Sequence, residues 1–316
     1  MADNATLREL LVRSLRHESE GVVSLRLEPR EGTLEHWEPG AHIDLVVADG
    51  STRQYSLCGS PSDPDYRIAV LREPAGRGGS EHLHRTVRPG DIVQVKGPRN
   101  HFALEDAPLH VLVAGGIGIT PILPMLAKLE ADGAPWRLYY AGRSRTTMAF
   151  LDELAPYGDK VTLAPSDEGT RLAFASMVAD APADALWYAC GPQRMLDGVS
   201  EALAAAGRED MLRTELFVAP EADVAAPAEG LTVELRSSGL TLPVPPDRSI
   251  LEVVTEAGID VMSDCEEGIC GSCETKVLEG VPDHRDYVLT SQEKAQNDCM
   301  MICVSRAQCP VLVLDL

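Results

Sequence analysis

The stretch Ser263-Asp-Cys-Glu-Glu-Gly-Ile-Cys-Gly-Ser-Cys273 decides the interpretation of the whole chain. Its three cysteines are spaced C-x4-C-x2-C, and Cys303 follows after a gap of 29 residues. Two irons bridged by sulfides need four thiolates, and three of these must come from one tight loop. The spacing therefore predicts a [2Fe–2S] cluster held by Cys265, Cys270 and Cys273 together with one later cysteine.

Two glycines in this loop, Gly268 and Gly271, support the cluster prediction. Glycine tolerates positive φ and carries no Cβ, so the loop can bring backbone N–H groups close to the sulfur atoms. A structural zinc site or a disulfide pair is the alternative. Zinc sites favour two C-x2-C pairs, whereas this chain has one such pair, preceded by C-x4-C.

Three later cysteines are candidates for the fourth ligand: Cys299, Cys303 and Cys309. Cys303 follows the apolar run Met300-Met301-Ile302, as expected at the end of a buried strand. Cys299 lies in a polar segment, and Cys309 is followed directly by a proline. The pattern favours Cys303 and leaves the other two open.

Length and composition limit the remaining possibilities. With 316 residues, the chain predicts two or three domains of about a hundred residues each. A net charge of −21 argues against nucleic acid, because phosphate binding needs basic stripes. No apolar run approaches the roughly 18 residues of a membrane span, and no signal peptide is visible. Eight cysteines, four of them assigned to metal, fit a reducing cytoplasm. We also expect a monomer.

The first hundred residues predict β structure. Short alternating runs, separated by Pro-Gly and glycine-rich turns, lie at residues 22–27, 41–47, 66–71 and 92–96. A single helix is expected around residues 80–86. Evenly spaced short strands of this kind predict a small antiparallel barrel.

One run in this region, Arg53-Gln-Tyr-Ser-Leu57, carries groups suited to a flat, phosphorylated ligand. On a strand, Arg53 and Tyr55 share one face, and an arginine fork makes paired charge-assisted bonds with phosphate. Tyr55 and Ser56 offer ring contact and hydrogen bonds to a heterocycle. The alternative is an ordinary amphipathic strand.

A second candidate is Gly76-Arg-Gly-Gly-Ser80, which runs directly into the predicted helix. A glycine-rich loop that feeds a helix start, with Ser80 as cap, is suited to an anion. A plain flexible loop is the alternative.

The middle of the chain predicts a different architecture. The apolar run at 110–114 is typical of a buried parallel strand, and Gly115-Gly-Ile-Gly-Ile-Thr-Pro121 follows at once. Thr120 as N-cap and Pro121 as first helical residue predict a helix that continues to about residue 131. Strand, glycine turn and helix form the arrangement that binds nucleotide pyrophosphates, although G-x-G-x-x-G is absent.

Alternating strands and helices continue this pattern. Strands are expected at 136–141, 161–164 and 186–190, and helices at 148–154, 172–178 and 192–206, which predicts a parallel α/β sheet. Cys190-Gly191-Pro192 ends a strand, where open α/β sheets place ligands, although a buried structural cysteine is the simpler interpretation. Arg143 and Arg145 could meet an adenosine ribose or its 2′-phosphate, or remain solvated.

The segment 219–230, rich in Pro, Ala and acidic residues, predicts a linker. Beyond it we expect a strand at 231–235, a helix at 250–257 capped by Asp247 or Ser249, and a final strand at 311–316. Residues 231–316 contain 15 acidic and 6 basic residues, a net charge of −9. This acidity favours solubility or steering toward a basic docking face.

The order of these motifs resembles the phthalate dioxygenase reductase family, which includes the vanillate O-demethylase reductases. The resemblance rests on A-G-G-I-G-I-T-P at 114–121, T-E-L-F at 214–217, C-V-S-R at 303–306 and the cysteine loop, and covers roughly residues 5–316. It implies an antiparallel β-barrel flavin domain (1–106) and a parallel-sheet α/β nucleotide domain of ferredoxin-reductase type (107–218). A linker (219–230) and an α+β plant-type ferredoxin domain of β-grasp type (231–316) follow.

The resemblance also implies roles for individual residues. FMN, rather than FAD, would contact Arg53, Tyr55 and Ser56, with its phosphate at Gly78, Gly79 and Ser80. NADH would lie along Gly115, Gly116, Gly118 and Thr120, with its nicotinamide near Cys190, Gly191 and Pro192. Glu215 and Phe217 match the segment near the flavin, and Cys265, Cys270, Cys273 and Cys303 match the iron ligands. Arg143 and Arg145 leave NADPH open as the donor.

The implied function is that of an NADH-dependent iron–sulfur flavoprotein reductase. It would take a hydride onto flavin and pass single electrons through the cluster to the Rieske non-haem iron oxygenase of a two-component aromatic hydroxylase or demethylase. No protein nucleophile or acid–base dyad is required. The alternatives are a reductase for a haem monooxygenase, a subunit of a larger dehydrogenase, and a redox sensor. The 29-residue cysteine gap argues against the dehydrogenase subunit, and the intact segment 115–121 argues against the sensor.

Overall fold

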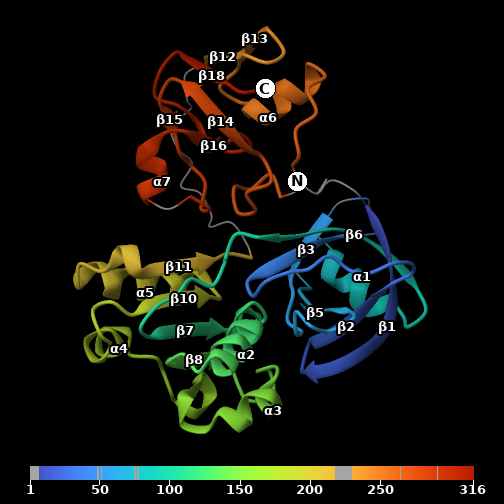
Figure 1. The fold of residues 1–316 in the computed structure, drawn as a ribbon, viewed down its shortest axis with the longest axis vertical. Helices are drawn as coiled ribbons and strands as arrows, with labels where there is room; N and C mark the ends of the chain where they lie inside the picture. The colour runs from blue at the N-terminus through green and yellow to red at the C-terminus, as the bar shows by residue number, and fades with distance from the viewer. Residues whose placement is uncertain are drawn as a thin grey trace. The chain divides into compact units, whose positions relative to one another are not determined.

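The computed structural model describes residues 7–47, 50, 52–74, 76, 78–217, 230–263, 265–289 and 291–316 (Figure 1). The chain folds as two compact units, Met1–Glu215 and Leu216–Leu316. The first unit contains two sheets, and the second contains the cysteine loop. No helix in these ranges is both long enough and apolar enough to cross a bilayer.

The first sheet is an antiparallel half-barrel of six strands in the order β4-β3-β6-β1-β2-β5. Its strands are β1 (Arg8–Ser19), β2 (Val22–Pro29), β3 (Ala41–Val46), β4 (Thr52–Ser56), β5 (Tyr66–Leu71) and β6 (Ile92–Asn100). The two ends of the sheet meet just after β4, where Leu57 forms an antiparallel bridge with Ile68 of β5. Helix α1 (Gly79–Arg85) contributes Leu83 to the barrel core. The predicted barrel is thus confirmed, with β1 as an additional strand.

The second sheet has five strands, all parallel, in the order β11-β10-β7-β8-β9. They are β7 (His110–Gly115), β8 (Trp136–Gly142), β9 (Val161–Pro165), β10 (Leu186–Cys190) and β11 (Leu212–Glu215). The helices between them are α2 (Ile122–Asp132), α3 (Leu151–Leu154), α4 (Phe174–Asp180) and α5 (Gln193–Ala205). The predicted α/β alternation is confirmed, and β11 is the strand that the pattern did not reveal.

The half-barrel and the parallel sheet share one apolar core. Four residues of the barrel region belong to the same buried cluster as the inner residues of the parallel sheet: Val22, Cys58, Ala69 and Phe102. The ring of Phe102 lies edge-on to Tyr188 of β10, with centroids 5.3 Å apart. The Tyr188 hydroxyl also accepts a hydrogen bond from Glu105 N at 2.8 Å. These contacts explain why residues 7–215 form one unit. The predicted domain border after residue 106 lies inside this unit.

The second unit is built on a five-stranded mixed sheet in the order β13-β12-β18-β14-β16. Its strands are β12 (Leu231–Leu235), β13 (Leu240–Val244), β14 (Glu274–Glu279), β16 (Cys299–Met301) and β18 (Val311–Leu314), of which β12 and β18 run parallel. Two short strands, β15 (Pro282–Asp283) and β17 (Arg306–Ala307), pair separately, and α7 spans Ser291–Gln296. Helix α6 (Ile250–Glu256) buries Ile250 and Val254 in the core of this sheet.

The predicted cap of α6 is confirmed in detail. Ser249 Oγ accepts a hydrogen bond from Glu252 N at 3.1 Å, and the Glu252 carboxylate accepts one from Ser249 N at 2.7 Å. This reciprocal pair satisfies two N–H groups that the helix leaves unbonded. The predicted linker, apart from Gly230, lies outside the described residues.

Two details of the helix predictions for the parallel-sheet region were wrong. Thr120 is not an N-cap, because a 3-10 turn, η1 (Gly116–Ile119), comes first and Thr120 already has helical φ and ψ. Its hydroxyl donates to Ile117 O at 3.0 Å, and Pro121 is the N-cap of α2. The helix expected from residue 148 begins only at Leu151, because Phe150 adopts a left-handed conformation with φ of 64°.

Candidate functional site

Strand β4 and the start of α1 come together at the predicted phosphate site. A Cβ added to Gly79 would lie 3.0 Å from Arg53 Cγ and 3.1 Å from Arg53 Nε, so the arginine stem rests directly on the helix start. Arg53 Nη1 donates to Thr52 O at 2.7 Å. Two segments that are separate in the sequence, and that the resemblance assigns to one ligand, therefore lie in direct contact.

The glycine loop before α1 differs from the prediction in its cap. Gly78 is the N-cap, with φ of 84°, and no side chain among the described residues caps the helix. Ser80 lies within the first turn, and its hydroxyl accepts a hydrogen bond from Glu73 N at 3.0 Å. Ser80 thus bonds to the backbone of Glu73 and does not cap the helix.

The end of β4 meets the ends of two parallel strands. Ser56 Oγ donates to Glu215 Oε2 at 3.2 Å, and Glu215 is the parallel-ladder partner of Cys190. Burial raises the pKa of Glu215 to about 8, so its carboxyl group holds a proton at neutral pH. Burial also raises the pKa of Cys190 well above its usual value, with the nearby Glu215 as a further cause. A hydroxyl, a carboxylic acid and a neutral thiol thus converge at the carboxyl edge of the sheet.

The predicted nucleotide turn is packed against the end of β10, with no room for a side chain at Gly115 or Gly118. A Cβ on Gly118 would lie 2.1 Å from Cys190 O, and one on Gly115 would lie 2.7 Å from Pro192 Cδ. A Cβ on Gly191 would lie 2.8 Å from Gly115 Cα. Only glycine permits this contact between the two turns. The structure therefore brings the two predicted nucleotide segments into direct contact.

Two residues that the sequence analysis missed shape this region. The buried hydroxyl of Tyr140 lies 3.1 Å from Gly116 O and 3.3 Å from Ala149 O, and its single proton can serve only one carbonyl at a time. Glu168 accepts from Arg145, with Nε–Oε1 at 2.7 Å and Nη2–Oε2 at 3.3 Å. Neither residue belongs to a motif, so its role depends on the fold.

The four predicted iron ligands lie together in the second unit as two pairs. The thiols of Cys265 and Cys270 are within hydrogen-bonding reach of each other, and so are those of Cys273 and Cys303. In the described part of the chain, no three His, Cys, Asp or Glu side chains converge on a position for a single ion. Two pairs of thiols suit a cluster of two irons, each bound by two thiolates, and do not suit one tetrahedral zinc ion.

Backbone and hydroxyl donors surround these sulfur atoms. Glu267 N donates to Cys265 Sγ at 3.3 Å, and Ser272 Oγ lies 2.7 Å from Cys270 Sγ. Gly268 and Gly271 have φ of 73° and 75°, as predicted for the loop. A Cβ on Gly268 would lie 2.6 Å from Val304 Cγ2. Ser272, which the sequence analysis did not assign, thus joins the donors that could stabilise the sulfur atoms of a bound cluster.

The two other candidate cysteines lie elsewhere in the second unit. Cys299 is in strand β16, opposite Lys276 of β14. Cys309 Sγ accepts from Val281 N at 3.3 Å and lies 3.1 Å from Val311 O. The preference for Cys303 therefore has geometric support.

Phe217 lies in the second unit and is 38% exposed, and its predicted position near the flavin remains a prediction.

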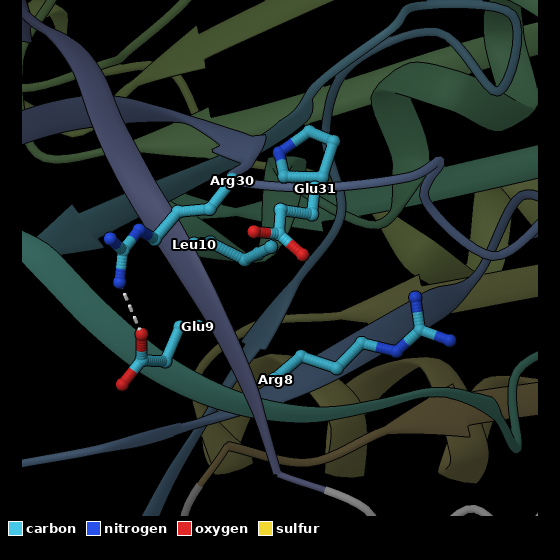
Figure 2. Close-up of a pocket in the computed structure, with 6 residues that line it drawn as sticks. Arg8, Glu9, Leu10, Arg30 and Glu31 are labelled. Carbon is cyan, nitrogen blue, oxygen red and sulfur yellow. Dashed lines mark hydrogen bonds and ion pairs between the residues drawn. The ribbon is translucent and has the colours of Figure 1, made fainter.

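A separate shallow pocket of about 440 Å³ lies where β1 begins and β2 ends (Figure 2). Arg30 Nη1 contacts Glu9 Oε2 at 2.6 Å there, and Arg8 pairs with Glu35 at 2.6 Å. These pairs cancel the charges that could attract an ion, and the pocket contains none of the predicted ligand residues. Its lining residues are Arg8, Glu9, Leu10, Pro29, Arg30 and Glu31.

Comparison with known proteins agrees with this geometry. A family model described as a 2Fe-2S iron-sulfur cluster binding domain matches residues 233–308. The chain is 47% identical over 298 residues to the phenoxybenzoate dioxygenase subunit beta of Ectopseudomonas oleovorans, covering 93% of this chain and 92% of that protein. It is 39% identical over 315 residues to the vanillate O-demethylase oxidoreductase of Pseudomonas putida, covering 98% of this chain and 99% of that protein.

Two solved structures resemble the chain over nearly its whole length. An intact type IV self-sufficient cytochrome P450 monooxygenase is 42% identical, with a TM-score of 0.92, covering 99% of this chain; the chain spans 41% of that protein. Phthalate dioxygenase reductase, described as a modular structure for electron transfer from pyridine nucleotides to [2Fe-2S], is 37% identical with a TM-score of 0.70 and covers 98% of both chains. The chain belongs to the phthalate dioxygenase reductase family, whose members are oxidoreductases that use a flavin, NAD(H) and a [2Fe–2S] cluster as reductase components of oxygenase systems.

Proposed function

We propose that this chain transfers a hydride from NADH to bound FMN and delivers the electrons singly, through its [2Fe–2S] cluster, to a terminal Rieske non-haem iron oxygenase. The observation that carries the proposal is the meeting of Ser56 with Glu215 and Cys190 inside the first unit. Ser56 belongs to the barrel, and the other two residues end neighbouring parallel strands. A ligand of the barrel and a ligand of the parallel sheet would therefore meet at these three side chains.

A bound flavin accepts a hydride from a nicotinamide and can release its electrons one at a time. The residues of the chain contribute orientation and control of charge. Glu215 holds a proton at neutral pH because burial raises its pKa to about 8, and the hydroxyl of Ser56 fixes one of its oxygens. Cys190 stays a neutral thiol for the same reason. Neither group would place a negative charge beside a bound flavin, which gains electron density when it accepts the hydride.

The proposed phosphate anchors are Arg53 and the helix start at Gly79 for FMN, and the turn at Gly115–Gly118 for NADH. The contact between Arg53 and Gly79 supports the first, since an arginine fork and helix N–H groups together suit a terminal phosphate. The open space at Gly116 supports the second, because no described atom lies within 4 Å of a Cβ built there and the backbone is left open to a pyrophosphate.

The ion pair of Arg145 with Glu168 favours NADH over NADPH. Strand β8 ends at Gly142, and the residues after the second strand of such a sheet commonly face the adenosine ribose. Arg145 alone would attract a 2′-phosphate, but Glu168 binds it and Asp167 adds further negative charge nearby. A ribose hydroxyl can hydrogen-bond to these carboxylates, whereas a phosphate would be repelled.

A Rieske oxygenase is the proposed partner because relatives that align over nearly the whole chain are named as parts of a dioxygenase and an O-demethylase. A haem monooxygenase is the second candidate, and the observation that favours it is the 0.92 TM-score with the self-sufficient P450 chain. The two candidate functions differ in the oxygenase that accepts electrons from the reduced chain. Mixing the NADH-reduced protein with each type of oxygenase and following oxidation of the cluster band separates them.

The first test is an anaerobic titration with NADH and then NADPH, followed by visible absorbance and electron spin resonance. The proposal expects NADH to bleach both flavin and cluster bands and to give the signal of a reduced [2Fe–2S] cluster. Bleaching of the flavin alone would refute electron delivery through the cluster. No bleaching by either nucleotide would refute the reductase function.

A further inference from the structure

Arg67 on β5 is a buried cation shared by the barrel and the nucleotide sheet. Its residue exposure is 8%, and its Nη2 donates to Glu18 Oε1 of β1 at 2.9 Å. Both terminal nitrogens also bind Glu153 of α3, at 3.0 Å and 2.7 Å. One guanidinium is thus held by two carboxylates from opposite sides of the joint between the sheets. Burial disfavours its charge, but the bonds with Glu153 and Glu18 outweigh that effect and raise the pKa of Arg67.

The same guanidinium also covers a strained residue. Arg67 Cζ lies 4.8 Å from the centre of the Phe150 ring. Phe150 has φ of 64°, a left-handed conformation that a bulky side chain rarely adopts without support from its surroundings. The N–H group of Leu154 donates to Phe150 O at 3.1 Å and starts α3, so the position of Glu153 depends on this residue. The arginine therefore contacts the start of α3 at two points, the ring of Phe150 and the carboxylate of Glu153.

The start of α3 is joined to the nucleotide turn by one side chain. Tyr140 of β8 is fully buried, and its hydroxyl lies between Ala149 O at 3.3 Å and Gly116 O at 3.1 Å. Ala149 directly precedes Phe150. A continuous series of contacts thus leads from Arg67 on the barrel, through Phe150, Ala149 and Tyr140, to the glycine turn at the end of β7.

We propose that Arg67 is a positioning residue that fixes the Gly115–Gly118 turn relative to the barrel and thereby sets the approach of the nicotinamide to the flavin. The inference rests on the proposed hydride transfer. Arg67 is suited to this role because its buried guanidinium is bonded to two carboxylates, which restricts the angle between the groups that carry them. A hydride moves efficiently only when donor and acceptor are held within a narrow range of distance, and a shift of about 1 Å costs about a hundredfold in rate.

The test compares Glu153→Gln with Glu130→Gln in the full, cofactor-loaded chain. Both glutamates are partly exposed in the parallel-sheet region, with side-chain exposures of 37% and 44%. Glu130 pairs with Lys160 at 2.5 Å and does not bind Arg67, so its variant controls for loss of a charge. Stopped-flow measurement of flavin reduction over a range of NADH concentrations separates the limiting rate from the dissociation constant. Hydrogen exchange of the peptide that covers residues 112–120 reports the turn directly.

The proposal expects Glu153→Gln to lower the limiting rate of flavin reduction by about tenfold or more, with the NADH dissociation constant changed less than about threefold. Exchange in residues 112–120 should become faster, and Glu130→Gln should match the unmodified protein in both measurements. A limiting rate within about twofold of the unmodified protein, or an equal loss in the control, would overturn the positioning role. Failure of the unmodified protein to react with NADH would overturn the proposed function as well.

Discussion

Replacing Gly118 with alanine should break the contact between the nucleotide turn and strand β10. The added methyl carbon would lie 2.1 Å from Cys190 O, 2.4 Å from Cys190 C and 2.8 Å from Gly191 N. These are backbone atoms at the end of a strand that is paired on both sides, by β7 and β11, so they cannot rotate away. The turn itself must move by roughly 1 Å to restore an ordinary contact distance.

The magnitude follows from this displacement. Overpacking of this kind costs about 1–3 kcal/mol of stability, and each kcal/mol lowers the melting temperature by roughly 2–4 °C in a unit of this size. A misplacement of about 1 Å at the nicotinamide should slow flavin reduction about a hundredfold. The flavin and the cluster should remain bound, because the three atoms nearest the added methyl group belong to Cys190 and Gly191 and not to the predicted flavin or iron anchors.

Gly133→Ala provides the matched control, because Gly133 ends α2 and lies outside the proposed site. Gly133 has φ of 67°, so alanine there costs about 1–2 kcal/mol of backbone strain, but no described atom lies within 4 Å of the added methyl group. Anaerobic stopped-flow reduction by NADH and thermal unfolding of both variants separate displacement from strain. If Gly118→Ala reacts as fast as Gly133→Ala, the reasoning from the close contact is refuted.

Three other perturbations test the remaining parts of the site. Cys303→Ser should lose the cluster, seen as loss of iron and of its absorbance, while Cys299→Ser should keep it; the opposite result would transfer the ligand role. Glu168→Gln should strengthen NADPH binding about tenfold relative to NADH by removing the carboxylate from Arg145, and an unchanged ratio in binding titrations would contradict this. Glu215 has a folded-state pKa of about 8 against 4.5 unfolded, so its protonated form contributes stability that is complete below pH 4.5 and lost as the pH rises through about 8. Glu215→Gln should flatten that decline in melting temperatures from pH 5 to 9; an identical pH profile would argue against it.

Local patterns predicted the strands whose burial pattern is unbroken, continuous in Leu186–Cys190 and alternating in Leu231–Leu235. Leu186–Cys190 and Leu231–Leu235 have the bounds that the sequence suggested. Strand β1 was not predicted, because its register against β2 shifts between Val12 and Ser14 and again between His17 and Ser19. Each shift resets which side chains face inward, so no period of two persists along Arg8–Ser19.

The residues of the candidate site likewise differ in whether a local pattern in the sequence could predict them. The iron ligands Cys265, Cys270 and Cys273 could be predicted because one short loop supplies them, and their spacing reflects the geometry of two irons. The bond of Ser56 with Glu215 joins residues 159 positions apart, and that of Arg67 with Glu153 joins residues 86 positions apart. Such pairs arise only when two sheets pack together, and nothing in the local pattern of either partner indicates the other.

The apolar core shared by the two sheets of the first unit limits how this chain can be recombined. Val22, Cys58, Ala69 and Phe102 would lose their buried neighbours if the barrel were produced without the parallel sheet, and the exposed apolar surface would favour aggregation. The second unit, by contrast, closes its own core around Val233 and Leu312. For protein engineering, the two units can therefore be exchanged at a junction near residues 215–216. The two sheets before this junction must be transferred together.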